Sequence, residues 1–176
     1  MSLKEVFQSV SGYFEREQLD YAVIGAFALY GYGYVRATQD IDFVTRLQNQ
    51  NKIIGFLENV GFETLNRSDG FSNHLHPIGS TRVDFVYIDG STAEEIFGAT
   101  TKIVLFDTIT VPVVNAEHLI ALKLFAAQNN PDRLFKELSD IKELLARSKV
   151  NALSVKNYFA KYGMEKYFDE TIGYSR

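Results

Sequence analysis

The sequence has 176 residues, a formal net charge of −4 and no cysteine. An apolar share of 46% can fill the core of one ordinary domain, and a charged share of 23% is typical of globular proteins. The lack of cysteine excludes a disulfide framework, a thiolate zinc site and a cysteine nucleophile. The negative charge argues against a broadly basic surface for duplex nucleic acid, although a local basic group could still hold an RNA end or a triphosphate.

Two features of the sequence indicate where the protein works. Residues 1–19 lack the basic start and the continuous apolar run of a signal peptide. No stretch approaches the roughly 18 consecutive apolar residues that suggest a membrane-spanning helix. We therefore expect a cytoplasmic protein with no membrane role.

The first elements follow from the spacing of apolar residues. From Leu3 to Phe14 these residues recur at helical intervals, which predicts an amphipathic helix of about four turns. Residues 21–24 are β-branched or aromatic and predict a buried strand that ends in a turn at Gly25. Residues 26–30 then predict a short helix.

Residues 39–45 predict a strand with two different faces. Side chains alternate along a strand, so Ile41 and Phe43 share one face while Asp40 and Asp42 share the other. The next apolar repeat predicts a helix over residues 52–60. Alternation returns in three more predicted strands, at residues 81–88, 102–106 and 108–114, the last two being joined at Asp107.

From Asn115 onward the pattern is helical. It predicts one helix around residues 119–125 and another over residues 134–145, with Pro131 separating them, and a last helix over residues 155–168. We predict an α+β fold in which residues 1–114 form a core with a small mixed sheet flanked by helices. Residues 115–176 would form a helical part packed on that core, as one compact unit.

Three aspartates form the candidate site. Asp40 and Asp42 project from one face about 7 Å apart along the chain, and Asp84 occupies a second strand of the same character. If the two strands are neighbours, the three carboxylates converge and require a cation or raised pKa values. Mg²⁺ suits such a site because it takes oxygen ligands from carboxylates and substrate phosphates.

Phosphoryl or nucleotidyl transfer uses this kind of site, with one metal activating the attacking oxygen and another neutralising the leaving group. Upstream, Gly25 allows the backbone to approach a phosphate, and amide groups at a helix start face the anion.

The residues Ile24 to Ala28, Gly31, Arg36, Thr38 and Asp40-Ile41-Asp42 resemble the signature of the DNA polymerase beta type nucleotidyltransferase superfamily. The resemblance is closest to the minimal AbiEii-like branch of abortive-infection and toxin–antitoxin systems. Its third aspartate matches Asp84 in the segment 82–85. Its helical motifs are similar to Glu117 with Lys123, and to the set Arg133, Lys136, Glu137 and Asp140. Two positions depart from the pattern: Ala26 replaces a second Gly or Ser, and Glu137 stands where Asp is usual.

The resemblance implies a Mg²⁺-dependent enzyme with a two-metal site that transfers a nucleoside monophosphate from a nucleoside triphosphate to a hydroxyl acceptor. Asp40, Asp42 and Asp84 would be the catalytic metal ligands. The nucleotide-binding residues would be Gly25, Ala26, Arg36, Thr38 and Lys123. The acceptor would be tRNA or a protein, with a cognate toxin or antitoxin as partner.

Two other functions compete with this hypothesis. A non-catalytic nucleotide-binding or antitoxin-like module would keep the fold without transfer, and Ala26 favours it. Transfer to a small molecule such as an antibiotic would predict a closed pocket between the sheet and the C-terminal helices.

Several residues also have simpler interpretations. Arg36 could pair with an aspartate, Lys123 could extend to solvent, and Asp140 is more typical of a helix-orienting hydrogen bond than of a ligand. His74 and His76 are interpreted as loop residues rather than metal ligands. Glu117 could favour a helix start, and the aromatic residues of the last helix indicate core or an interface.

Overall fold

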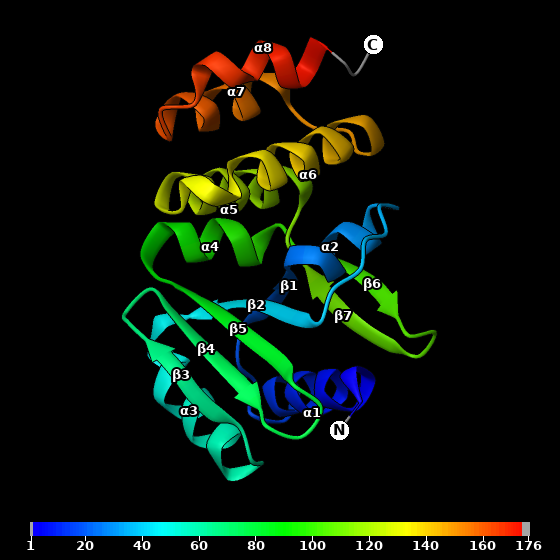
Figure 1. Ribbon diagram of the computed structural model, residues 1–176, viewed down its shortest axis with the longest axis vertical. Coiled ribbons are helices and arrows are strands. Elements are labelled where there is room, and N and C mark those ends of the chain that lie inside the picture. The colour runs from blue at the N-terminus through cyan, green and yellow to red at the C-terminus, as the bar shows by residue number, and fades with distance from the viewer. Residues whose placement is uncertain (1, 174–176) are drawn as a thin grey trace. The chain divides into compact units, whose positions relative to one another are not determined.

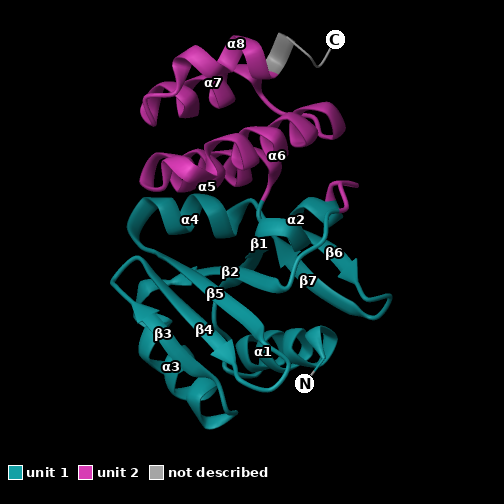
Figure 2. Ribbon diagram, viewed as in Figure 1, with its two compact units in different colours: residues 1–31, 36–114 teal, residues 32–35, 115–176 magenta. Residues whose placement is uncertain are grey.

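A computed structural model describes residues 2–173 of the chain (Figure 1). The chain divides into two compact units, coloured separately in Figure 2. Unit 1 comprises residues 1–31 and 36–114, and unit 2 comprises residues 32–35 and 115–176. The expected packing of the helical part on the core stays a prediction.

Within the described residues, unit 1 contains one mixed sheet in the order β3-β4-β5-β2-β1-β7-β6. Two neighbouring pairs, β2 with β5 and β1 with β7, are parallel, and the other pairs are antiparallel. The strands are β1 (Tyr21–Ile24), β2 (Asp40–Arg46), β3 (Glu63–Arg67), β4 (Phe71–His76), β5 (Thr81–Ile88), β6 (Thr101–Leu105) and β7 (Ile109–Val113). This arrangement, together with the helices below, confirms the predicted α+β class.

Helices α1 (Leu3–Arg16) and α3 (Gln50–Asn59) lie on one face of this sheet (Figure 1). A capping box formed by Ser2 and Glu5 begins α1. The rings of Phe7 and Phe14 on α1 then contact Phe43 of β2. Burying one such ring contributes roughly 1.5–3 kcal/mol, so these contacts fix the apolar face of β2 toward α1. The remaining helical segments of unit 1 are α2 (Gly25–Gly31), the 3₁₀ turn Leu47–Asn49, and α4 (Gly90–Gly98).

Strands β3 and β4 were not predicted, and the interpretation of His74 and His76 as loop residues is wrong. Both histidines are buried in β4, where His74 is 0% exposed. Its Nε2 lies 2.8 Å from Ser72 Oγ, and its Nδ1 lies 3.2 Å from Thr64 Oγ1. Burial lowers the pKa of His74 to about 4. The imidazole is therefore neutral at physiological pH and is held by neighbouring hydroxyls.

Unit 2 is helical. Its elements are α5 (Ala116–Asn129), the 3₁₀ turn Pro131–Arg133, α6 (Leu134–Arg147), α7 (Ala152–Lys161) and α8 (Glu165–Gly173). Asn115 begins α5 by accepting a hydrogen bond from the backbone N–H of His118 at 2.8 Å. The prediction of one helix over residues 155–168 is wrong because Gly163, with φ of +68°, interrupts it between α7 and α8.

In the described part of the chain, no helix combines the length and apolar character that crossing a bilayer requires. The cytoplasmic location stays a prediction.

Candidate functional site

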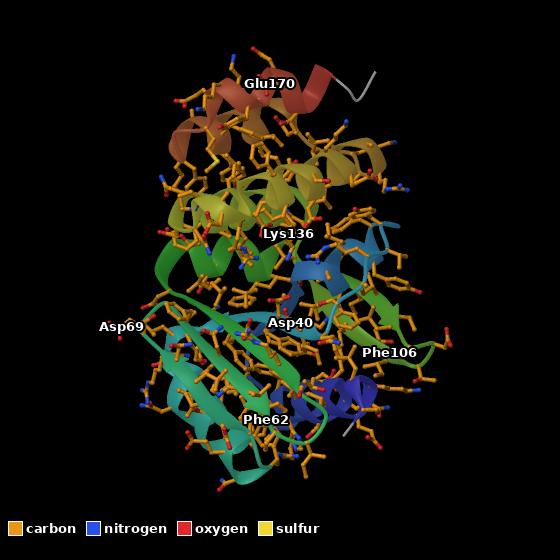
Figure 3. The ribbon with its side chains drawn as sticks, in the orientation of Figure 1. Asp40, Phe62, Asp69, Phe106, Lys136 and Glu170 are labelled. Carbon is orange, nitrogen blue, oxygen red and sulfur yellow. The ribbon has the colours of Figure 1, made fainter. Side chains whose placement is uncertain are left out.

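The carboxylate face is the side of β2 and β5 that carries Asp40, Asp42 and Asp84. The two strands are parallel neighbours, and their register sets Asp42 directly opposite Asp84. Asp40 lies two residues earlier on β2, opposite Arg82. All three aspartates are half-buried, whereas the alternate residues of both strands point into the apolar core. Figure 3 labels Asp40 on this part of the sheet. Register and alternation therefore bring all three carboxylates to one face.

Gly25 borders this face at the end of β1. Its neighbour Ile24 pairs with Asp42, and Gly25 itself has a φ of +64°. A Cβ atom at Gly25 would lie only 2.0 Å from Asp42 Oδ2. Glycine is required here for two reasons: the backbone conformation is left-handed, and the Asp42 carboxylate occupies the space of a side chain. Ala26 follows as a buried residue of α2, 4% exposed.

Thr38 holds the backbone of Asp40. Its Oγ1 accepts a hydrogen bond from the Asp40 N–H at 3.1 Å and donates one to the Asp40 carbonyl oxygen at 3.1 Å. Arg36, two residues earlier, is half-buried in the segment that leads into β2. The contacts of Thr38 fix the start of β2, so it acts on the site through Asp40; direct nucleotide binding by Thr38 and Arg36 stays a prediction.

The carboxylate face has ligand types that suit Mg²⁺, but it is not a preassembled metal cage. Among residues 2–173, no group of three or more His, Cys, Asp or Glu residues is close enough to hold a metal ion. Two carboxylates about 4 Å apart repel by roughly 4 kcal/mol at an effective dielectric near 20, which opposes closer approach without a cation. Mg²⁺ is commonly held by only one or two carboxylates, with phosphate oxygens and water completing its shell. The donor set therefore fits a metal that arrives with a phosphate ligand.

Strand β4 extends the carboxylate face in a way that the sequence did not reveal. Asn73 lies opposite Asp84 on the antiparallel neighbour strand and is half-buried. Phe71, two residues earlier on the same face, is 47% exposed. Periodicity could not predict these positions because the buried residues of β4 are the polar Ser72, His74 and His76, which reverses the usual apolar alternation.

Lys123 of α5 lies in a buried charge cluster within unit 2. Its Nζ donates to Glu137 Oε2 at 2.9 Å and to Asp140 Oδ2 at 2.6 Å, and Lys123 is only 5% exposed. Arg133 donates to the other oxygen of Glu137 at 2.6 Å. Burial alone would raise the pKa of Glu137, but the charges and hydrogen bonds of Lys123 and Arg133 outweigh it and lower that pKa.

This cluster corrects one expectation for Lys123 and refines others. The lysine does not extend to solvent. Asp140 makes a helix-to-helix hydrogen bond, and Glu117 accepts one from the backbone N–H of Asn151 at 2.7 Å, near the start of α7. Since two of the three Lys123 N–H donors are taken by carboxylates, binding a phosphate would use the third. A phosphate-binding role for Lys123 stays a prediction.

No family model matches the sequence, and no curated protein is significantly similar to it. Solved structures, however, are similar over most or all of the chain. The antibiotic-resistance factor ANT(2'')-Ia in solution shares 16% identity over 100% of both chains, with a TM-score of 0.69. The fold is that of the nucleotidyltransferases.

Two further structures support this assignment of the fold. The lincosamide antibiotic adenylyltransferase LnuA, bound to lincomycin, aligns with 84% of this chain and 99% of its own at 16% identity and a TM-score of 0.60. ANT(2'')-Ia in complex with adenylyl-2''-tobramycin aligns with 92% of this chain and 97% of its own, at 14% identity and a TM-score of 0.68. The aligned regions of these structures therefore include parts of both units. Membership in the AbiEii-like branch stays a prediction.

Proposed function

We propose that this protein is a metal-dependent nucleotidyltransferase that moves a nucleoside monophosphate from a nucleoside triphosphate to a hydroxyl group. One observation carries the proposal: Asp42 lies opposite Asp84, and Asp40 lies on the same face. Gly25 borders this face, and the Asp42 carboxylate occupies the space that a side chain at position 25 would need. Carboxylates on neighbouring strands of one face supply the oxygen ligands that a divalent cation such as Mg²⁺ takes.

The residues have distinct roles in this proposal. Asp40 and Asp42 would hold Mg²⁺, and Asp84 would complete the set. Bound Mg²⁺ supplies Lewis-acid stabilisation of the phosphate charge. The acceptor oxygen forms a bond to the α-phosphorus while the bond from that phosphorus to pyrophosphate breaks, and the hydroxyl proton passes to a carboxylate, for which Asp84 is the candidate. Amide groups at Gly25 and Ala26 would seat the phosphates.

For the acceptor we favour a small hydroxylated molecule. The neighbours of matching length are named as adenylyltransferases or resistance factors for antibiotics, and both were solved with antibiotic compounds. The net charge of −4 also disfavours a polyanionic acceptor. A tRNA or protein acceptor, with a cognate toxin or antitoxin partner, is the second candidate and rests on the AbiEii-like resemblance of residues 24–42.

A transfer assay tests the proposal. The protein is incubated with Mg²⁺ and each of the four α-labelled triphosphates, with tobramycin, lincomycin, total RNA or total protein as acceptor. We expect labelled product and pyrophosphate with a small molecule. Asp42→Asn should abolish both, while Asp69→Asn, an exposed aspartate outside the site, should retain them.

The other outcomes also decide between the functions. Label in RNA or protein would move the proposal to the second candidate. Nucleotide binding that depends on Mg²⁺ but yields no pyrophosphate with any acceptor would indicate the non-catalytic module. Equal transfer by wild type and Asp42→Asn would reject the site.

A further inference from the structure

Arg82 is a basic residue of the carboxylate face. It lies on β5 two residues before Asp84, so both side chains project from the same face. The parallel register sets it directly opposite Asp40 on β2. A guanidinium is therefore held within the row of carboxylates.

The surroundings of Arg82 differ from those of Arg46, which lies on the same face of β2. Arg46, at the opposite end of β2, donates to Asp20 at 2.6 Å and to Glu94 at 2.7 Å, so its charge is neutralised within the fold. Arg82 has no ion pair with any residue that the structure describes. Its Nε is buried and has no hydrogen-bond partner among those residues. Buried N–H groups are rarely left this way, and a guanidinium keeps its charge in proteins.

The chemistry of this position favours an anionic oxygen ligand. Removing an N–H group from water is costly unless an acceptor replaces the water, and an anion is the acceptor that a guanidinium binds best. The planar fork of arginine matches the oxygens of a phosphate, which it can bind through two parallel hydrogen bonds. The neighbouring carboxylates are the groups expected to take the metal, so the anion that reaches Arg82 would come from outside the chain.

We propose that Arg82 binds the triphosphate chain of the nucleotide and supplies the cationic contact to phosphate on the carboxylate face. This inference rests on the proposed function and deepens it. With Arg82 in this role, the proposed function does not require Lys123, which is held by Glu137 and Asp140, as a phosphate ligand. Metal and arginine together would offset the negative charge that three aspartates and a triphosphate place on one face.

Calorimetric titration with Mg²⁺ and inorganic tripolyphosphate, and then with each Mg²⁺–triphosphate, tests the inference. Arg82→Gln should weaken binding of these phosphates by about 10- to 100-fold, the effect of losing charge-assisted hydrogen bonds. Arg82→Lys keeps the charge without the fork and should recover part of the affinity. Arg16→Gln removes an equally charged but exposed side chain on α1 and should bind as wild type.

The outcomes separate this inference from the proposed function. Wild-type affinity in Arg82→Gln would overturn the role of Arg82 alone. Failure of the wild-type protein to bind any Mg²⁺–triphosphate would overturn both. If Arg82→Gln fails to fold, folded Arg82→Lys decides: unchanged affinity and an unchanged KM for the triphosphate would reject the contact, and a raised KM with little change in kcat would support it.

Discussion

The carboxylate face of unit 1 and the charge cluster of unit 2 use acidic residues in opposite ways. On the carboxylate face, three half-buried aspartates share one side of two strands, and like charges are neighbours. In the cluster, Glu137 and Asp140 are almost fully buried and both bind the Lys123 ammonium. In the second arrangement a buried cation lies between the two carboxylates; for the first, a bound metal ion is part of the proposed function.

The environment of Lys123 could not be predicted from its charge alone. A lysine near acidic motif residues suggests phosphate binding when only the sequence is read. Its burial and its two short ion pairs show that Lys123 links α5 to α6, and phosphate binding by Lys123 stays a prediction. Two buried carboxylates that share one buried lysine are therefore interpreted as a structural ion cluster.

The largest effect should come from breaking the cluster. Lys123→Ala leaves two carboxylates buried without their shared cation, and such losses typically cost about 3–5 kcal/mol of unfolding free energy. Urea unfolding of the whole chain measures this loss of unfolding free energy. Lys136→Ala, at an exposed position on α6, is the matched control and should change stability by less than about 0.5 kcal/mol. A loss below about 1 kcal/mol in Lys123→Ala would contradict a structural role.

A smaller effect, on activity more than on stability, is expected at the carboxylate face. Gly25→Ala places a methyl group on the Asp42 carboxylate and should displace it, and misplacement by about 1 Å can lower a transfer rate by about 10²-fold. Gly90→Ala is matched in backbone strain, with φ of +58°, but its new Cβ contacts nothing within 4 Å. If both variants lose the same activity, backbone strain rather than the contact with Asp42 is the cause.

The smallest effect concerns the pH dependence of the cluster. Because the folded state lowers the pKa of Glu137, its contribution to stability is complete above the ordinary carboxyl pKa of 4.5 and is lost as pH falls through the lowered value. Glu137→Gln should therefore differ most from wild type near neutral pH. The difference should shrink below pH 4.5, at up to about 1.4 kcal/mol per pH unit.

Unfolding at several pH values measures this difference. The exposed Glu170→Gln serves as the control and should follow the wild-type curve. A Glu137→Gln curve that stays parallel to wild type below pH 4.5 would show that the carboxylate is not stabilised by its neighbours.

Much of the fold could be predicted because its central elements follow simple periodicities. The alternation that predicted β2 and β5 reflects Ile41, Phe43 and Phe85 in the core. Strand β4 was missed since its inward residues are polar, and α4 was missed because Gly90–Gly98 is short and bounded by glycines. The break at Gly163 depends on a backbone conformation that the aromatic spacing concealed.

The candidate site was predicted only in part. Two aspartates on one strand are visible in the alternation of residues 39–45, but the register of β5 against β2 depends on pairing between distant segments. That register brings Asp84 opposite Asp42 and adds Arg82 and Asn73 to the face. Pairing partners and buried polar contacts are tertiary properties, so periodicity could not specify them.

The parallel pairing of β2 and β5 has an evolutionary consequence. Residues 47–80 connect two strands whose facing aspartates must stay in register, and this connection contains α3, β3 and β4. Its turns, such as residues 77–80 between β4 and β5, can change length at a small entropic cost. One residue inserted or deleted within β5 would instead rotate Asp84 into the core and bring Val83 or Phe85 to the surface. Natural variants of this protein should therefore tolerate gains and losses in the turns between the two strands while excluding them within either strand.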